Sequence, residues 1–211
     1  MSSFNVYGVG ANAVILGLDP AKDVSGAALL LGPGAIHSYG LAKKQRDREF
    51  FVREGVRLAA EAGKPFICVA EEWDPPRHRR KRTATGEERV EFDQKWTYPT
   101  VLGMGAGWGL WLAELLRVDY REQDIIRVKP NTWRDALFGS RRTKDTRTSK
   151  ALALAFGIHA LRLPFQPDLD KALASGEADI AEAACIGVWA FKQSRVAELA
   201  DKKLKKLSKS P

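Results

Sequence analysis

Apolar and polar positions along the chain follow two different periods, which divide it into expected strands and helices. Short continuous apolar runs are typical of buried strands, whereas apolar residues spaced three and four apart are typical of helices. The apolar runs predict strands at residues 13–19, 26–31, 35–40, 66–70 and 125–128. Helical spacing, together with Pro and Gly near element ends, predicts helices at residues 46–62, 98–118, 130–137, 149–156 and 177–193.

The connections between these elements constrain how they are arranged. The turn Gly32-Pro33-Gly34 joins the second and third runs, so the first three strands are expected to form an antiparallel meander. A chain of 211 residues with 45% hydrophobic content suffices for one compact domain. We therefore expect a single domain over residues 1–195 and a Lys-rich tail over residues 196–211.

One stretch, residues 74–97, breaks the pattern. Asp74-Pro75-Pro76 leads into the basic run Arg77–Arg82, and little apolar periodicity follows. Such a charge run is most often a solvated segment, but attraction to phosphates requires no folded geometry. We expect a mobile basic loop inserted into the domain.

The overall charge indicates a polyanionic partner. Lys and Arg number 34 against 26 Asp and Glu, which leaves a formal net charge of +8. Nucleic acid is favoured over acidic lipid because the basic residues do not line an amphipathic helix with an aromatic apolar face.

The chain also carries indications of its location. Its apolar stretches are all shorter than the roughly 18 residues that would suggest a membrane span, and its N-terminus lacks the features of a signal peptide. Cys68 and Cys185 lie in apolar surroundings rather than in a disulfide framework. We expect an intracellular protein without a membrane partner, cytoplasmic if it is bacterial or phage-encoded.

Four carboxylates stand where a core would bring them together. Asp19 closes the first apolar run before Pro20, and Glu71 closes a later run. Asp179 and Glu182 are three residues apart on one helix and therefore share a face. Converging acids repel one another unless cations neutralise them, and hard oxygen ligands suit Mg²⁺ or Mn²⁺. Two such ions about 4 Å apart can hydrolyse a phosphodiester.

Each acid also has a simpler interpretation. An Asp before Pro is common as a turn former, and for Asp19 alone the turn is favoured. Asp179 and Glu182 could be a solvated face near a helix N-terminus, where acids complement the dipole, and Glu71 could be part of a salt bridge. His37, His78 and His159 form no ligand pattern.

Four segments resemble the RuvC-type Holliday junction resolvases. They are ILGLDPAKDVSGAALL, KPFICVAEE, RVKPNTWRDALFG and EADIAEAACIGVWAF, which occur in the family's order between residues 13 and 192. The resemblance implies an RNase H-like fold of the α/β class, in which a five-stranded mixed sheet is flanked by helices.

The resemblance also implies roles for individual residues. The family's metal-binding acids match Asp19, Glu71, Asp179 and Glu182, and its basic residues near the scissile phosphate match Lys129 and Lys150. Glu71 is preferred to Glu72 because of its spacing from Pro65, and strand alternation points the two side chains to opposite faces. The last acid is Glu182 where the family usually has Asp, which leaves metal ligation possible.

The expected function is that of a structure-selective endonuclease that nicks four-way DNA junctions with two Mg²⁺ ions, for which Mn²⁺ can substitute. The residues expected to bind DNA are Arg77, Arg79, Arg80, Lys81, Arg82, Lys129, Arg141, Arg142, Lys144 and Lys150. Trp73, Trp96 and Tyr98 are candidates for stacking on unpaired bases. A homodimer would match the two-fold symmetry of the junction, with the glycine-rich helix around Gly103 and Gly107 as its interface.

Three alternatives stay open. A RuvC-like fold could cut other branched DNA or RNA, since fold does not determine substrate. The actin-like sugar kinases and ATPases also open with an acidic strand and hairpin, but this chain is too short for their two lobes. A non-catalytic nucleic-acid-binding module on the same fold would neither bind metal nor cleave.

Overall fold

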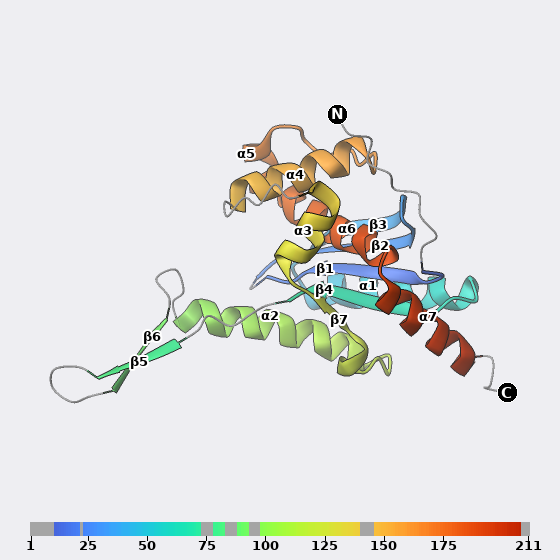
Figure 1. Ribbon diagram of the computed structural model, residues 1–211, viewed down its shortest axis with the longest axis horizontal. Helices are drawn as coiled ribbons and strands as arrows, with labels where there is room; N and C mark the ends of the chain where they lie inside the picture. Colours follow the sequence, from blue (N-terminus) through green and yellow to red (C-terminus); the bar gives the residue numbers. More distant parts are fainter. Residues whose placement is uncertain are drawn as a thin grey trace.

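A central five-stranded sheet organises the molecule (Figure 1). The computed structural model describes residues 11–21, 23–72, 78–82, 88–92, 98–139 and 146–207. The strands, in the spatial order β3-β2-β1-β4-β7, are β1 (Val14–Asp19), β2 (Ser25–Gly32), β3 (Ala35–Ala42), β4 (Phe66–Glu71) and β7 (Ile126–Val128). The first three are antiparallel neighbours, whereas β4 is parallel to β1 and β7 is parallel to β4. The expected mixed sheet with an initial meander is thus confirmed.

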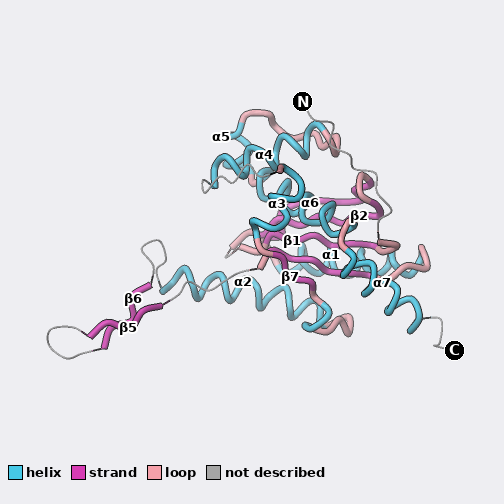
Figure 2. Tube along the Cα trace, viewed as in Figure 1, coloured by secondary structure: helices cyan, strands magenta, loops and turns pink. Residues whose placement is uncertain are grey.

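Helices cover both faces of this sheet (Figures 1 and 2). Their bounds are α1 (Gln45–Glu61), α2 (Tyr98–Leu116), α3 (Pro130–Phe138), α4 (Thr146–His159), α5 (Leu169–Ser175), α6 (Glu177–Phe191) and α7 (Ser194–Leu207), with a short 3-10 helix at Glu122–Asp124. Helix α6 packs directly on β1 and β2, with α3, α4 and α5 behind it. Helices α1 and α2 cover the opposite face.

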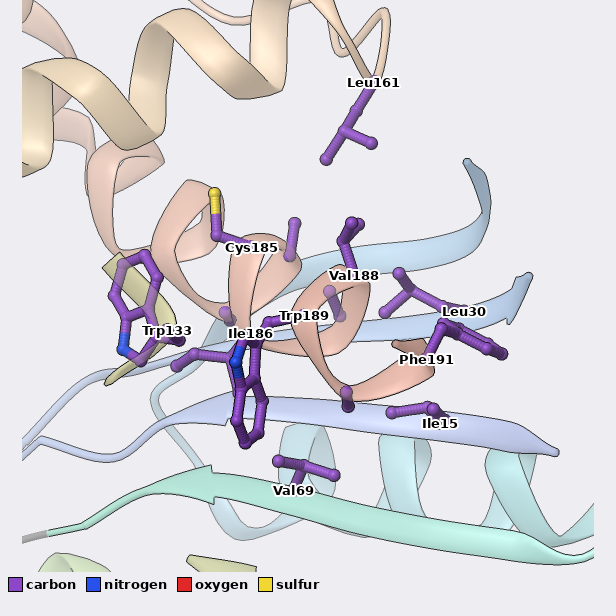
Figure 3. Close-up of a cluster of buried hydrophobic side chains, with 14 of the residues drawn as sticks. Ile15, Leu30, Val69, Trp133, Leu161, Cys185, Ile186, Val188, Trp189 and Phe191 are labelled. Atoms are coloured by element: carbon purple, nitrogen blue, oxygen red, sulfur yellow. The ribbon is translucent and has the colours of Figure 1, made fainter. Parts of the chain in front are cut away.

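The alternation of side chains along β1 divides the core into two layers. Ile15 lies in the layer under α6, where Figure 3 shows Trp189 of α6 reaching towards Val69 of β4. Leu16 and its even-numbered neighbours belong to the other layer, which α1 and Trp111 of α2 complete. Because side chains of both faces are buried, the continuous apolar runs of β1 and β4 follow directly from the architecture.

Two segments differ from the expectation. Inside the stretch expected as a loop, β5 (His78–Arg82) pairs antiparallel with β6 (Glu88–Phe92), so the prediction of a stretch without strands was wrong. In the register of these two strands Arg79 is paired with Glu91 and Arg82 with Glu88. The tail expected from residue 196 is helical in α7 as far as residue 207, and Val196 and Ala200 are fully buried. Within the described ranges, no helix is long and apolar enough to cross a membrane.

Candidate metal centre

Two neighbouring strands deliver carboxylates to one edge of the sheet. Asp19 is the last residue of β1, and Glu71 is the last residue of β4. The strands are parallel, with Leu18 paired to Ala70, so both acids lie at the same end. Asp179 and Glu182 lie in the first two turns of α6, which passes over this end of β1 and β2.

Strand alternation decides between two consecutive glutamates, Glu71 at the end of β4 and Glu72 directly after it. Ile67 and Val69 belong to the core layer under α6, so Glu71 points to the same face as α6. Cys68 and Ala70 belong to the layer under α1, and Glu72 follows them to that opposite face. Glu71 is therefore the glutamate on the side of Asp179 and Glu182.

Glycines on the sheet let α6 approach closely enough for its acids to reach Asp19. A methyl group at Gly26, which pairs with Asp19 across β1 and β2, would overlap the backbone carbonyl of Asp179. A methyl group at Gly17 would likewise overlap the backbone of α6 at Ala183. Only a residue without Cβ permits such contact, which accounts for Gly in these two strands.

Three of the four acids converge. Oxygen atoms of Asp19, Asp179 and Glu182 all lie within 4.8 Å of one another, and Glu182 is only 2% exposed. Glu71 stands beside this group, where its Oε2 accepts a hydrogen bond of 2.9 Å from Nε1 of the buried Trp133. Three or four carboxylates of this kind are a suitable oxygen donor set for a divalent cation.

Two basic side chains lie among the acids. Lys150 of α4 forms an ion pair with Asp179, and its Nζ is 3.1 Å from Oε2 of Glu182. Nη2 of Arg134 donates to Oε1 of Glu182 at 2.7 Å and lies 3.7 Å from Oε2 of Glu71. Four carboxylates against two cations leave an excess of two negative charges when all are ionised.

The electrostatics of the acids reflect this excess. Burial raises the pKa of Asp19 well above its ordinary value, and repulsion from Glu182 and Glu71 raises it further. Burial also raises the pKa of Glu71 to about 7, although the Arg134 guanidinium acts in the opposite direction. Burial alone would lower the pKa of Lys150, but the carboxylates of Glu182, Asp19 and Asp179 outweigh it and raise that pKa.

These observations test whether a divalent cation fits. The donors are hard oxygens on two separate elements, β1 and α6, and the raised pKa of Asp19 means that its ionised form lacks sufficient positive charge nearby. A bound divalent cation would supply that charge. The donor set and its electrostatics fit such an ion, which Asp19, Asp179 and Glu182 would hold. Glu71 lies at the same edge of the sheet, beside these three acids.

The structure also places the other predicted residues. Lys129 is exposed and forms the N-cap of α3, directly after the β7 residue that pairs with Glu71. Arg79, Arg80, Lys81 and Arg82 belong to β5, and Tyr98 begins α2. The remaining predicted residues, which lie outside the described ranges, are Arg77, Arg141, Arg142, Lys144, Trp73 and Trp96.

Sequence reasoning missed Trp133 and Arg134, which contact the acids from α3. Within the segment RVKPNTWRDALFG, the resemblance points to Lys129 alone. The spacing of these residues from Pro130 could have indicated them. Helix α3 begins at Pro130 directly after β7, the neighbour of β4, so residues about one turn into α3 lie near the edge of the sheet where β4 ends.

Comparisons with known proteins agree with this architecture. No protein-family model matches the chain, and no curated protein sequence matches it. Among solved structures, RuvC of Thermus thermophilus in complex with a Holliday junction substrate is similar over 88% of this chain and 97% of that chain, with a TM-score of 0.54 and 16% sequence identity. The yeast mitochondrial Holliday junction resolvase is similar over 96% of this chain and 88% of its own, with a TM-score of 0.45 and 11% identity.

The first of these likenesses establishes the fold. The chain has the RNase H-like fold of the RuvC type, as its sequence segments implied.

Proposed function

We propose that this protein is a metal-dependent endonuclease that nicks four-way DNA junctions. The observation that carries the proposal is the convergence of Asp19, Asp179 and Glu182 within 4.8 Å at the sheet edge of a protein with net charge +8. The fold supports it, because the similar T. thermophilus RuvC was solved with a Holliday junction substrate. The proposed cofactor is a pair of Mg²⁺ ions, which Mn²⁺ can replace.

The residues of the site have different proposed roles. Bound divalent ions would activate water and stabilise the leaving oxygen during phosphodiester hydrolysis. Trp133 and Arg134 hold Glu71 by its Oε2 and so fix the orientation of that carboxylate towards the site. Lys150 keeps its positive charge beside Asp179 and Glu182 and can attract a phosphodiester to the acids.

A nicking assay tests the proposal. Labelled four-way, three-way, flap and linear duplex DNA are incubated with the protein and Mg²⁺. The wild type is expected to cut the four-way junction best, and Asp19→Asn is expected to abolish cleavage while junction binding persists. Asp23→Asn, an exposed acid in the loop after β1, is the control and should cut normally. Normal cutting by Asp19→Asn would refute the metal site, and preference for another substrate would redirect the proposal to other branched nucleic acids.

We also propose that the active form is a homodimer that pairs through α2. Exposed apolar or small residues recur along this helix at spacings of four and three, namely Leu102, Ala106, Gly109, Ala113 and Leu116. Leu102 is 55% exposed and Leu116 is 54% exposed, and the space beside Gly109 is open. Such a stripe suits close packing of two helices. Of the two glycines first expected at the interface, Gly107 is buried within the protomer.

A further inference from the structure

Arg48 of α1 is mostly buried, and its Nε has no partner among the residues that the structure describes. Its residue surface is only 7% exposed, and its Nε forms no hydrogen bond. Within the part of the chain that the structure describes, Arg48 has no ion pair with any acid. A buried guanidinium nitrogen without a hydrogen bond is costly for the folded protein, and arginine cannot lose its proton to avoid the cost. An anion bound to the guanidinium of Arg48 would offset that cost.

The position of Arg48 is defined by the sheet register. Helix α1 starts directly after β3, whose Ala42 pairs with Ser25, and the neighbouring Gly26 pairs with Asp19. The first turns of α1 therefore lie at the same edge of the sheet as the carboxylates. They lie on the opposite face, because α1 packs against the layer that contains Leu18.

Positive charge surrounds this end of α1. Lys43, Lys44 and Arg46 are exposed at the start of the helix, and its N-terminus contributes a partial positive charge of its own. Asp47 is the one acid between residues 43 and 48. Its Oδ2 accepts hydrogen bonds from the backbone amides of Lys43 and Lys44, and its Oδ1 lies 3.8 Å from Nε of Arg46. Side chains on a helix lean towards its N-terminus, which directs Arg48 to the same end.

We propose that this α1 basic end, formed by Lys43, Lys44, Arg46 and Arg48, binds a backbone phosphate of the DNA substrate, with Arg48 as its anchor. A guanidinium matches a phosphate with two parallel hydrogen bonds, and a cluster with three excess positive charges suits a polyanion better than a single carboxylate. The identity of the phosphate as DNA rests on the proposed nuclease function. The strand would be held from the face of the sheet opposite to the acids.

Measurements of melting temperature and DNA affinity distinguish a phosphate-binding role of Arg48 from a role in packing alone. In phosphate-free buffer, Arg48→Met is expected to melt at the same temperature as the wild type or higher, because it removes an unpaired buried charge. Its affinity for a four-way junction, measured by fluorescence anisotropy with Ca²⁺ to prevent cutting, is expected to fall about tenfold or more. The slope of log affinity against log salt should also decrease by about 0.9 for one lost phosphate contact.

Two further variants serve as controls. Arg53→Met removes an exposed arginine of the same helix that pairs with Glu49 at 2.8 Å, and it should leave melting and affinity close to wild type. Arg48→Lys keeps the charge without the fork and should bind with intermediate affinity. A lower melting temperature for Arg48→Met with unchanged affinity and salt slope would mean that Arg48 only packs. A weakened dimer with unchanged affinity would mean that it meets an acid of a second copy, and this also overturns the proposal.

A titration with inorganic phosphate distinguishes failure of this inference from failure of the proposed function. Phosphate is expected to raise the melting temperature of the wild type more than that of Arg48→Met. If phosphate has this effect but the wild type binds no DNA, the phosphate site is supported and the proposed nuclease function is rejected. Junction binding by the wild type, together with equal phosphate effects and equal affinities in both proteins, would reject the site alone.

Discussion

Ionisation of Glu71 should make the metal-free protein less stable at pH 8 than at pH 5. Burial raises the pKa of this carboxyl from an ordinary 4.5 to about 7, against the opposing effect of Arg134. Below pH 4.5 Glu71 is protonated in both the folded and unfolded states, so its environment has no effect. As the pH rises towards 7 the unfolded chain releases this proton first, and stability falls; the difference in pKa corresponds to about 3 kcal/mol.

The neighbouring acid adds to the effect. The pKa of Asp19 is also raised by burial and by Glu182, so its ionisation destabilises the fold in the same direction. Bound Mg²⁺ should restore much of the stability at pH 8, because an ion that binds only the folded state adds to its stability by mass action.

Urea unfolding in EDTA at the two pH values measures the change. Glu71→Gln should lose less stability than the wild type between pH 5 and pH 8, by up to about 3 kcal/mol. Glu72→Gln removes the adjacent acid on the opposite face and should behave like the wild type. Groups away from the site contribute equally to all three proteins, so the comparison isolates Glu71 together with its effect on the pKa of Asp19. A wild type as stable at pH 8 as at pH 5, or a full loss in Glu71→Gln, would refute the argument.

Three other changes test separate parts of the structure. Gly26→Ala should push α6 away from β2, destabilise the fold by about 1–3 kcal/mol and weaken Mg²⁺ binding measured by calorimetry. Gly32→Ala on the same strand is the control, because a methyl group there meets only an ordinary contact. Equal effects of the two substitutions would contradict the close approach of α6 to β2. Arg134→Met leaves the buried Glu182 with only one of its two neighbouring cations. The stability of the metal-free protein in urea should therefore fall by about a few kcal/mol, and nicking should slow. Unchanged values would show that Lys150 alone compensates the charge of Glu182. Leu102→Glu places a charge in the exposed stripe of α2 and should reduce the sedimentation coefficient to that of a monomer. An unchanged value with intact circular dichroism would exclude this interface.

The parts of the fold and candidate site that sequence predicts well are those with local signals. The end of β1 at Asp19 follows from an apolar run and Pro20, and the shared face of Asp179 and Glu182 follows from helical spacing. Their convergence needed one further inference, that neighbouring parallel strands end at the same edge. The metal-ligand roles of these acids stay a prediction.

Other parts depend on contacts that the sequence does not reveal. The sequences of β5 and β6 are mostly charged and lack apolar alternation, so a pattern-based prediction finds no strand there. The Lys-rich sequence of α7 hides a face whose Val196 and Ala200 are buried. Arg134 reaches Glu182 from an element 48 residues away along the chain, and the direction of such a side chain depends on how α3 is seated on the fold.

Side-chain alternation gives the two faces of one sheet edge opposite charges. Asp19 and Glu71 follow odd-numbered core residues of their strands to the α6 face, where the acids exceed the cations. The even-numbered residues lead to the face covered by α1. On that face, Nε of Arg48 has no hydrogen-bond partner among the described residues. A one-residue shift in β1 or β4 would send a carboxylate to the wrong face. The register of β1 with β2 and β4 therefore fixes the face to which the acids point. A bulge introduced before Asp19 should abolish metal binding while leaving the α1 basic end intact. Separate titrations with Mg²⁺ and phosphate would detect that difference, and loss of both responses in a folded variant would contradict it.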